Sequence, residues 1–411
     1  MILRKAFSVA SAQPCRNCLG HLFNRVLTCI ASDPGGVGNA YNLIGLGQVR
    51  RLTAFPSGIV DSYSLPISYD SVRRALREVP RRWLITGGAG FIGSHLLREL
   101  LTLGQRVLVL DNLSTGSWRN LEEVQESVGP EAWAGLEVRE GDLRDAEACS
   151  AACEGVELVL HQAAIASVPA SLEDPLTTHE VNVTGTLHLF HAARRASVQR
   201  VVYASSSAVY GTDEAPVKQE TATGRLLSPY AASKAIGEVY GQTFTQCYGL
   251  ETVGLRYFNV FGPRQDPAGP YAAVIPLWIQ AALRETPLFV NGDGSTTRDF
   301  ISVRNVVQAN IQAALAPASL VAGAAFNIGS GLQIDLNTLI QEISQVIARE
   351  FPELRPPEAV RREFRAGDIQ HSLADISKAR RCLGFEPQVR FTDALAETVA
   401  WFAGEQTTLE R

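Results

Sequence analysis

The chain has 411 residues, is 46% hydrophobic and carries a formal net charge of −5. Its length is enough for one large α/β domain and a smaller lobe, with a sizeable core. The mildly acidic balance gives no support for nucleic-acid binding, and since no run of about 18 apolar residues occurs, we expect no membrane span. Seven scattered cysteines, an odd number, predict reduced thiols in a cytoplasmic protein.

Residues 1–68 differ from the rest of the chain. No acidic residue precedes Asp33, although several basic ones do. This composition fits either an organelle-targeting peptide or translation from a misplaced start, with the true start near residue 60; we favour the second interpretation. We therefore expect an N-terminal extension that is either disordered or a misassigned start. Cys15 and Cys18 could form half of a zinc site, but no second ligand pair follows at a suitable spacing, so we predict no metal.

A glycine-rich turn at 87–93 follows the first predicted strand, 82–86, and precedes an amphipathic helix over 94–101. Glycines there allow a tight turn and the close approach of a diphosphate to the helix N-terminus, where N–H groups are unpaired. A second predicted strand, 106–111, ends in Asp111, about 20 residues beyond the turn, where a carboxylate accepts hydrogen bonds from ribose hydroxyls. Because that acid would repel a 2′-phosphate, the unit predicts NAD as the cofactor rather than NADP.

Strands continue to alternate with helical patterns as far as about residue 262. The further predicted strands are 136–142, 158–161, 200–204 and 252–257. Polar residues follow each of them, which is the edge where parallel sheets bind ligands. We therefore expect an α/β fold, with a Rossmann-type doubly wound parallel sheet over 69–262. Over 263–411 the alternation relaxes, and we expect a smaller C-terminal substrate-binding lobe interleaved with the last strands of the first domain.

Tyr230 and Lys234 lie four residues apart in a predicted helix, which places both side chains on one face. A lysine ammonium beside a phenol favours the phenolate, as does the positive charge of an oxidised nicotinamide. Both lower the pKa of a tyrosine from its ordinary value of about 10, and alcohol oxidation requires such a base. Alone, the spacing also fits an ordinary exposed pair. After a complete dinucleotide unit, it predicts an acid–base catalyst.

These motifs resemble those of the extended short-chain dehydrogenase/reductase superfamily, and within it the bacterial UDP-N-acetylglucosamine 4-epimerases. The similarity covers roughly residues 69–403. The segments that carry it are TGGAGFIGS, LDNLSTG, GDLRD, LHQAA, SSSAVYG, SPYAASK, LRYFNVFGPRQDP, YAAVIP, NGDGSTTRDFI and RAGDIQHSLADISKA. So many matches in the same order leave little room for chance.

The resemblance implies a role for individual residues. The catalytic group is Ser206, Tyr230 and Lys234. The NAD-binding residues are Gly87, Gly90, Phe91, Ile92, Gly93, Asp111, Asn112, Asp142, Leu143, Gln162, Ala163, Ala164, Asn182, Tyr230, Lys234 and Tyr257. The substrate-binding residues are Ser207, Asn259, Arg298, Arg365, Asp368 and Ser372.

The resemblance also implies a reaction, the NAD-dependent inversion of carbon 4 of a UDP-hexose through a transient 4-keto intermediate. The expected substrate pair is UDP-N-acetylglucosamine and UDP-N-acetylgalactosamine. Relatives restricted to sugars without an acetyl group carry tyrosine at the position of Ser372, where serine leaves room for an acetamido group. We further expect a homodimer.

Other functions stay open at this point. A UDP-N-acetyl-hexuronic acid or UDP-glucose is an alternative substrate for the same epimerisation. A sugar-nucleotide dehydratase would share the fold and cofactor, but it needs an acid–base pair, usually Asp-Glu, directly after the catalytic hydroxyl, where this chain has Ser207 and Ala208. A decarboxylase would usually carry glutamate at the position of Ala208. A non-enzymatic NAD(H) sensor is an alternative of another class, although it would not need Tyr230 and Lys234.

Overall fold

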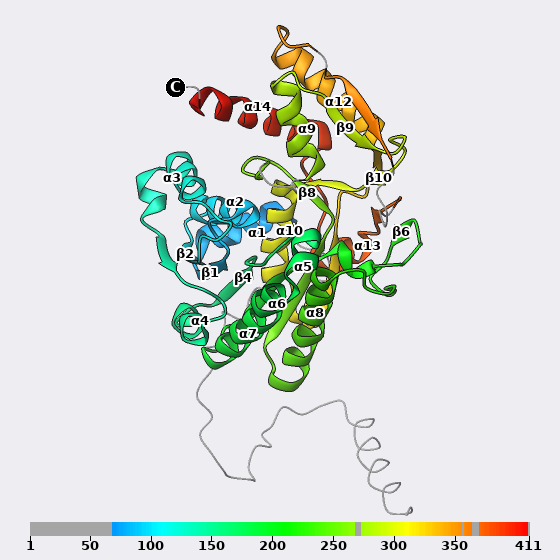
Figure 1. The fold of residues 1–411 in the computed structure, drawn as a ribbon. Helices are drawn as coiled ribbons and strands as arrows, with labels where there is room; N and C mark the ends of the chain where they lie inside the picture. Colours follow the sequence, from blue (N-terminus) through cyan, green and yellow to red (C-terminus); the bar gives the residue numbers. More distant parts are fainter. Residues whose placement is uncertain (1–67, 268–272, 356, 364–369, 410–411) are drawn as a thin grey trace, which may run out of the picture. The chain divides into compact units, whose positions relative to one another are not determined.

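The computed structural model describes residues 68–267, 273–355, 357–363 and 370–409. At its centre is a sheet of seven strands in the order β12-β7-β5-β4-β1-β2-β3, all paired in parallel (Figure 1). The strands are β1 (Arg82–Thr86), β2 (Arg106–Asp111), β3 (Leu136–Glu140), β4 (Leu158–His161), β5 (Arg200–Ser206), β7 (Glu251–Tyr257) and β12 (Ala324–Ile328). The expected Rossmann-type doubly wound sheet is thus confirmed.

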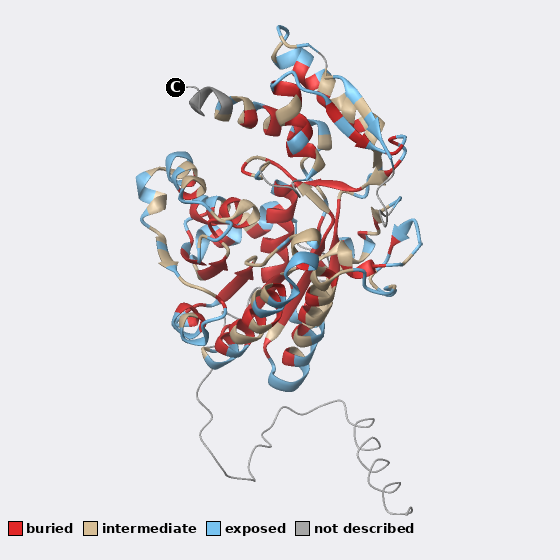
Figure 2. Ribbon diagram, in the orientation of Figure 1, coloured by how far each residue is buried: buried red, intermediate tan, exposed pale blue. Residues whose placement is uncertain are grey.

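Helices cover both faces of this sheet, because alternate residues of each strand point to opposite sides. On one face, a buried cluster joins the sheet to α1 (Tyr69–Glu78), α2 (Phe91–Thr102), α3 (Trp118–Trp133), α10 (Val303–Leu315), α11 (Ala318–Val321) and α13 (Ser377–Leu383). On the other face, a second cluster joins it to α4 (Ala146–Cys153), α7 (Thr186–Arg195) and α8 (Pro229–Tyr248). Figure 2 shows the buried residues along the strands and on the inward sides of the helices.

The structure differs from the sequence prediction at element ends. Helix α2 begins at Phe91, with Gly90 as its N-cap, three residues before the predicted start. Strand β3 ends at Glu140, two residues early. Strand β12 is an additional edge strand that the sequence analysis did not predict. Its residues follow a long segment without regular alternation, so the pattern that marked the earlier strands is missing there.

A third buried cluster forms the core of a smaller group of elements that follows residue 262. It unites α9 (Val274–Leu283), β9 (Leu288–Asn291), β11 (Phe300–Ser302), α12 (Leu336–Glu350) and α14 (Phe391–Leu409). Between these elements the chain returns to the main sheet, where it contributes α10 and β12. The boundary at 262/263 stays a prediction, and so does the N-terminal extension, which lies outside the described residues apart from Ser68.

The remaining elements are short connections around the sheet. They are α5 (Val168–Glu173), α6 (Pro175–His179), the π-helical turn η1 (Glu180–Gly185), the 3₁₀ turn η2 (Ser207–Tyr210), β6 (Val217–Lys218), β8 (Asn259–Phe261), β10 (Thr297–Arg298), β13 (Ile334–Asp335), β14 (Ala359–Arg362) and β15 (Leu373–Ala374). Within the described part of the chain, no helix combines the length and the apolar character needed to cross a bilayer.

Candidate active site

A cavity of about 1050 Å³ lies at the carboxyl ends of the sheet strands, the edge where parallel sheets bind ligands. Its volume is slightly above the roughly 300–1,000 Å³ typical of small-molecule sites. Most of the predicted cofactor and catalytic residues line it. They are Gly87, Gly90, Phe91, Ile92, Gly93, Asp111, Asn112, Asp142, Leu143, Gln162, Ala163, Ala164, Ser206, Tyr230, Lys234 and Tyr257.

The glycine turn leaves space that a side chain would fill. Gly87 has a φ of +70°, and a Cβ on it would lie 2.7 Å from the backbone nitrogen of Ala163. A Cβ on Gly93 would lie 2.0 Å from the carbonyl oxygen of Gly87. The N-cap of α2, Gly90, has no side chain to satisfy the first N–H groups of the helix. These groups therefore remain available to the oxygens of a phosphate.

Asp111 has a second role that the sequence analysis did not predict. Its Oδ2 accepts a hydrogen bond of 2.9 Å from the N–H of Ala89 in the glycine turn, and its Oδ1 accepts one of 2.9 Å from Leu113. The carboxylate thus fixes the turn that would hold the phosphates. Because each carboxylate oxygen has two acceptor sites, both can still accept a ribose hydroxyl.

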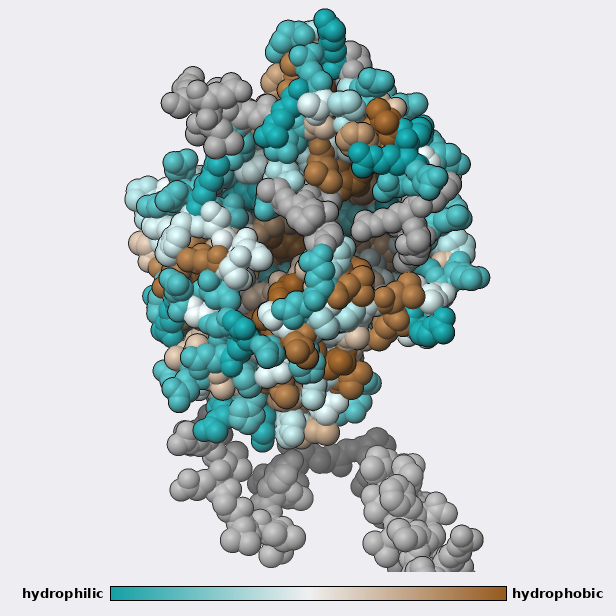
Figure 3. Space-filling view, viewed as in Figure 1, coloured by the Kyte–Doolittle hydropathy of each residue, from teal (hydrophilic) through white to brown (hydrophobic). Residues whose placement is uncertain are grey.

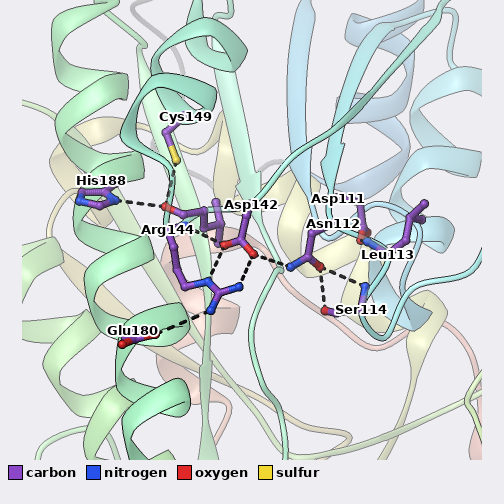
Figure 4. A network of polar contacts seen from close by, with 10 residues as sticks. Asp111, Asn112, Leu113, Ser114, Asp142, Arg144, Cys149, Glu180 and His188 are labelled. Atoms are coloured by element: carbon purple, nitrogen blue, oxygen red, sulfur yellow. Dashed lines mark hydrogen bonds and ion pairs between the residues drawn. The ribbon is translucent and has the colours of Figure 1, made fainter.

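A separate polar network begins at Asn112, the residue after Asp111, and runs along the cavity (Figure 4). The Nδ2 of Asn112 donates to Asp142 Oδ2 over 2.8 Å, and the guanidinium of Arg144 makes two hydrogen bonds to the same carboxylate, at 2.8 and 3.0 Å. The hydrogen bonds from Arg144 are the main reason that the pKa of Asp142 lies far below its ordinary value. Asp142 is therefore a carboxylate at neutral pH, at the place where the resemblance implies the adenine.

The start of helix α8 presents Tyr230 and Lys234 to the cavity. Ser228 caps the helix through a 3.1 Å hydrogen bond from the N–H of Ala231, and proline occupies its first position. Tyr230 therefore lies in the first turn and Lys234 in the second, on the same face. The phenol is hydrogen-bonded to Ser206, the last residue of β5, while Lys234 Nζ donates to the carbonyl oxygen of Ala204 over 2.9 Å. The structure thus brings the three predicted catalytic residues together.

Burial has the largest effect on the pKa values of both Tyr230 and Lys234. It raises the pKa of Tyr230, and only the hydrogen bond with Ser206 opposes it. This direction is opposite to the one that the spacing of Tyr230 and Lys234 predicts, because the Lys234 ammonium bonds to a carbonyl group and lies 5.8 Å from the centre of the phenol ring. Burial also lowers the pKa of Lys234 to about 8.

Two predicted residues lie close to the cavity without lining it. The amide of Asn182, in η1, accepts a 2.8 Å hydrogen bond from the N–H of Ile165 and donates one of 3.0 Å to its carbonyl oxygen. It thereby holds the loop after β4, which does line the cavity. Ser207 is half-buried in the 3₁₀ turn that follows Ser206. Their predicted contacts with cofactor and substrate stay predictions.

The other predicted substrate residues lie on the side of the smaller lobe. Asn259 donates to the carbonyl oxygen of Asp299 over 3.2 Å, and Arg298 donates to that of Gln370 over 3.3 Å. Ser372 is half-buried just before β15. Arg298 and Ser372 are thus brought close together, although 73 positions separate them. Arg365 and Asp368 lie outside the described residues.

Asp299 holds this region together, and the sequence analysis assigned it no role. Its buried carboxylate accepts hydrogen bonds from Ser330 (2.7 Å from both its N–H and its hydroxyl), from Gly331 (3.0 Å) and from Ala374 (3.2 Å). Burial raises the pKa of Asp299, and these hydrogen bonds oppose the rise. The one signal for it was its place in the segment NGDGSTTRDFI.

Comparison with known proteins decides the family. A profile of the NAD dependent epimerase/dehydratase family matches residues 83–329. The UDP-glucose 4-epimerase of Mycolicibacterium smegmatis is 39% identical over 324 residues, which cover 78% of this chain and 98% of that protein. The chain belongs to the NAD-dependent epimerase/dehydratase family.

Solved structures of similar proteins agree with this assignment. A UDP-N-acetylglucosamine 4-epimerase from Methanobrevibacter ruminantium, in complex with UDP-N-acetylmuramic acid, is 38% identical, with a TM-score of 0.72 over 79% of this chain and 99% of that one. A UDP-glucose 4-epimerase from Thermus thermophilus, in complex with NAD, is 36% identical, with a TM-score of 0.68 over 79% of this chain and 99% of that one.

NAD is thus the cofactor of this epimerase/dehydratase family member, and the cavity fits it. The glycine turn and the N-terminus of α2 suit a diphosphate, and Asp111 suits a ribose. Further along the wall, the hydroxyl of Tyr257 donates to Gln162 over 3.1 Å and accepts a 2.8 Å hydrogen bond from Asn310. Asn310, on α10, is a buried positioning residue that the sequence analysis missed.

Arg264 is a second residue of the cavity wall that the sequence analysis did not assign, although it lies in the segment GPRQDP. The loop that carries it is fixed by a 2.9 Å hydrogen bond from His95 Nε2 to the carbonyl oxygen of Pro263. Arg264 is 7% exposed, and its Nε and Nη2 have no hydrogen-bond partner among the described residues. Burial lowers the pKa of its guanidinium to about 10. It remains a cation at neutral pH, with donors available to a ligand.

Protein purified without added nucleotide is expected to carry NAD, because the cavity is large enough to enclose a dinucleotide and Asp111 disfavours a 2′-phosphate. The measurement is denaturation of the purified protein followed by chromatography of the released nucleotide against NAD and NADP standards. NADP as the main released nucleotide would contradict the expected role of Asp111.

Proposed function

We propose that the protein inverts carbon 4 of a UDP-hexose, interconverting UDP-N-acetylglucosamine and UDP-N-acetylgalactosamine. The observation that carries this proposal is the arrangement of Tyr230, its hydrogen-bond partner Ser206, and Lys234 in one wall of the NAD cavity. It is supported by the names of similar proteins, which include UDP-glucose and UDP-N-acetylglucosamine 4-epimerases.

In this mechanism Tyr230 takes the proton of the 4-hydroxyl group of the sugar and returns it before the product leaves. Ser206 is hydrogen-bonded to the phenol, and its oxygen can still accept a hydrogen bond from the 4-hydroxyl group, so it can bridge the sugar and Tyr230. When bound, oxidised NAD supplies the hydride acceptor for carbon 4 and a positive charge that favours the Tyr230 phenolate. Lys234 donates to the carbonyl oxygen of Ala204 and thereby ties the start of α8, which carries Tyr230, to the end of β5.

The residue after Ser207 argues against the other reactions of the family. Elimination of water or loss of carbon dioxide is usually served by an acidic side chain at the position of Ala208. Here that position carries only a methyl group, and its N–H donates to Ser206 Oγ over 3.1 Å. The structure therefore favours epimerisation over dehydration and decarboxylation, and the presence of Tyr230 and Lys234 favours an enzyme over an NAD(H) sensor.

The function is tested by incubating the purified protein with UDP-N-acetylglucosamine, UDP-glucose and a UDP-N-acetyl-hexuronic acid in turn and identifying the products by NMR. A product inverted at carbon 4 supports the proposal, and the fastest substrate identifies the sugar. Elimination of water or loss of carbon dioxide would assign the protein to another branch of the family. Bound NAD without turnover of any sugar would favour the sensor.

The size of residue 372 is expected to decide whether an N-acetylated sugar is accepted. Ser372 is half-buried, beside the 2.9 Å hydrogen bond that joins Thr297 to His371. Ser372→Tyr should lower kcat/KM for UDP-N-acetylglucosamine at least about tenfold more than for UDP-glucose, because the larger side chain takes the place of the acetamido group.

The control for this prediction is the same substitution at an exposed serine nearby. Ser377→Tyr, at the start of α13, should leave the ratio of the two kcat/KM values unchanged. An equal loss for both sugars in the Ser372→Tyr protein would remove residue 372 from substrate selection.

We also propose that the protein is a cytoplasmic homodimer that pairs through the face of α5, α6 and α8. Large apolar side chains are exposed there, among them Leu172 (62%), Leu176 (75%) and Val239 (63%). Figure 3 shows hydrophobic residues on this face. Contiguous apolar residues on a surface mark interfaces, and a second copy of the chain would cover them. The described cysteines are unpaired, in keeping with a reducing compartment. Light scattering of the purified protein, with Leu176→Asp as the disrupting variant, tests the dimer.

A further inference from the structure

Three consecutive residues at the end of β5 each contact one of three residues on α8. Ser206 is hydrogen-bonded to Tyr230, and the carbonyl oxygen of Ala204 accepts from Lys234. Between them, the hydroxyl of Ser205 donates to Oε1 of Glu238 over 2.5 Å. Tyr230, Lys234 and Glu238 follow one another at four-residue steps, which places them along a single helix face.

Glu238 is held in turn by Arg256 on the neighbouring strand. Arg256 Nε donates to Oε1 over 2.9 Å and Nη2 donates to Oε2 over 2.7 Å, a two-point ion pair. In the parallel pairing of β5 and β7, Arg256 is directly opposite Ser205, and Tyr257 is opposite Ser206. One carboxylate thus ties the helix that carries Tyr230 to two adjacent strands, at the level of Ser206.

The network extends to the chain segment that follows Ser206. Arg256 Nη1 donates to the hydroxyl of Tyr210 over 3.1 Å, and that hydroxyl donates to Asn327 Oδ1 over 2.6 Å. Ser205 and Arg256 are buried, with exposed fractions of 2% and 6%. Hydrogen bonds through Tyr210 therefore fix the 3₁₀ turn after Ser206 to β7 and β12.

A buried ion pair of this kind is poor evidence for stability, because removing two charges from water costs about as much as their attraction returns. It does fix geometry, since a bidentate carboxylate–guanidinium pair allows few orientations. Proton transfer between a phenol and a sugar hydroxyl depends on that geometry, and an error of about 1 Å can cost on the order of 100-fold in rate.

We propose that Glu238 and Arg256 are positioning residues of the reaction, which set the distance between Ser206 and Tyr230 through Ser205. Neither residue lines the cavity. They act through the groups that do. This inference rests on the proposed function, because it takes Ser206 and Tyr230 as the groups that handle the proton of the sugar.

The same two strands provide a matched control at their other ends. Arg200 and Glu251 are also directly opposite each other on β5 and β7, and they form an ion pair with hydrogen bonds of 2.8 and 2.5 Å. Arg200 is 3% exposed and also donates to backbone carbonyl groups of α10 and the residue after it. Its arginine is as buried as Arg256, its acid is more exposed than Glu238 (27% against 16%), and the pair lies away from the cavity.

The experiment compares Glu238→Gln with Glu251→Gln in the full chain. We expect both to lower Tm, since each weakens a buried ion pair. Only Glu238→Gln should lower kcat for UDP-N-acetylglucosamine, by about tenfold or more, with KM and bound NAD within about twofold of the wild type. A kcat within about twofold of the wild type in Glu238→Gln, or equal losses of kcat in both variants, would overturn the proposal.

Two further measurements keep the test decisive. If Glu238→Gln does not fold, Ser205→Ala keeps the ion pair and removes one hydrogen bond. It should lower kcat several-fold, and an unchanged kcat would overturn the proposal.

If the wild type turns over no UDP-sugar, the proposed function fails, but the positioning role of Glu238 and Arg256 is still testable. Ultraviolet titration of Tyr230, as the difference from Tyr230→Phe, should then show a higher pKa in Glu238→Gln and no change in Glu251→Gln. An unchanged pKa in both would overturn it.

Discussion

Replacing Tyr230 with phenylalanine is expected to lower kcat by about 100-fold or more, the scale of a well-placed acid–base group. The change removes one oxygen atom, so the ring still fills its place at the start of α8, and the NAD content should stay at the wild-type level. Ser206 alone cannot replace the phenol, because a serine hydroxyl is far too weak an acid to take the proton as an alkoxide. Turnover of UDP-N-acetylglucosamine and nucleotide content after denaturation are the two measurements.

A matched substitution at a remote tyrosine controls for the loss of a buried hydroxyl. Tyr69, on α1, is buried and donates a 3.1 Å hydrogen bond to Glu99. Tyr69→Phe should lower stability slightly, by about 1 kcal/mol, and leave kcat unchanged. Near-normal kcat in Tyr230→Phe, or equal losses in the two variants, would remove Tyr230 from the reaction.

The cofactor half of the site could be predicted because its signals are local in the sequence. A turn between one strand and one helix contains the glycines, and the next strand ends in Asp111. Residues that follow successive parallel strands meet at one edge, so strand ends alone place Gln162, Ser206 and Tyr257 together. The structure confirms that all of these line one cavity.

The substrate half was harder to predict, because its residues come from segments that meet only in the folded chain. Arg298 and Ser372 are close because the N–H of Thr297 donates to the carbonyl oxygen of Gln370 over 2.9 Å, and because Asp299 binds Ala374. No periodic pattern in the sequence indicates such a contact. The resemblance named the outer residues but not Asp299, the carboxylate that holds them.

Burial explains the remaining differences. The spacing of Tyr230 and Lys234 shows that they share a helix face, but not that both side chains are buried, which raises the pKa of one and lowers that of the other. Glu238 reads in the sequence as an ordinary helix-surface acid. Only the fold brings Arg256 and Ser205 within hydrogen-bonding distance of its carboxylate. Sequence patterns place residues on helices and strands. The pKa and the orientation of each side chain depend on the residues that pack against it.

Gly93→Ala is expected to abolish the retention of NAD and to lower the free energy of unfolding by about 1–3 kcal/mol, the usual cost of overpacking. The added methyl group would lie 2.0 Å from the carbonyl oxygen of Gly87 and 2.8 Å from Gly88 Cα. Both contacts are with backbone, so no change of side-chain rotamer relieves them. The turn must move away from α2, and the phosphates lose the N–H groups that face them.

Gly404→Ala is the control, because Gly404 is an exposed residue of α14 and, among the described residues and apart from the backbone of its own helix, no atom lies within 4 Å of the added Cβ. This variant should retain NAD and gain up to about 1 kcal/mol of stability, since alanine favours a helix over glycine. Thermal unfolding and the amount of nucleotide released on denaturation distinguish the two variants. Full NAD content in Gly93→Ala would show that the glycine turn tolerates a side chain and that the diphosphate binds elsewhere. Loss of stability without loss of NAD would confine the role of Gly93 to the packing of α2 against β1.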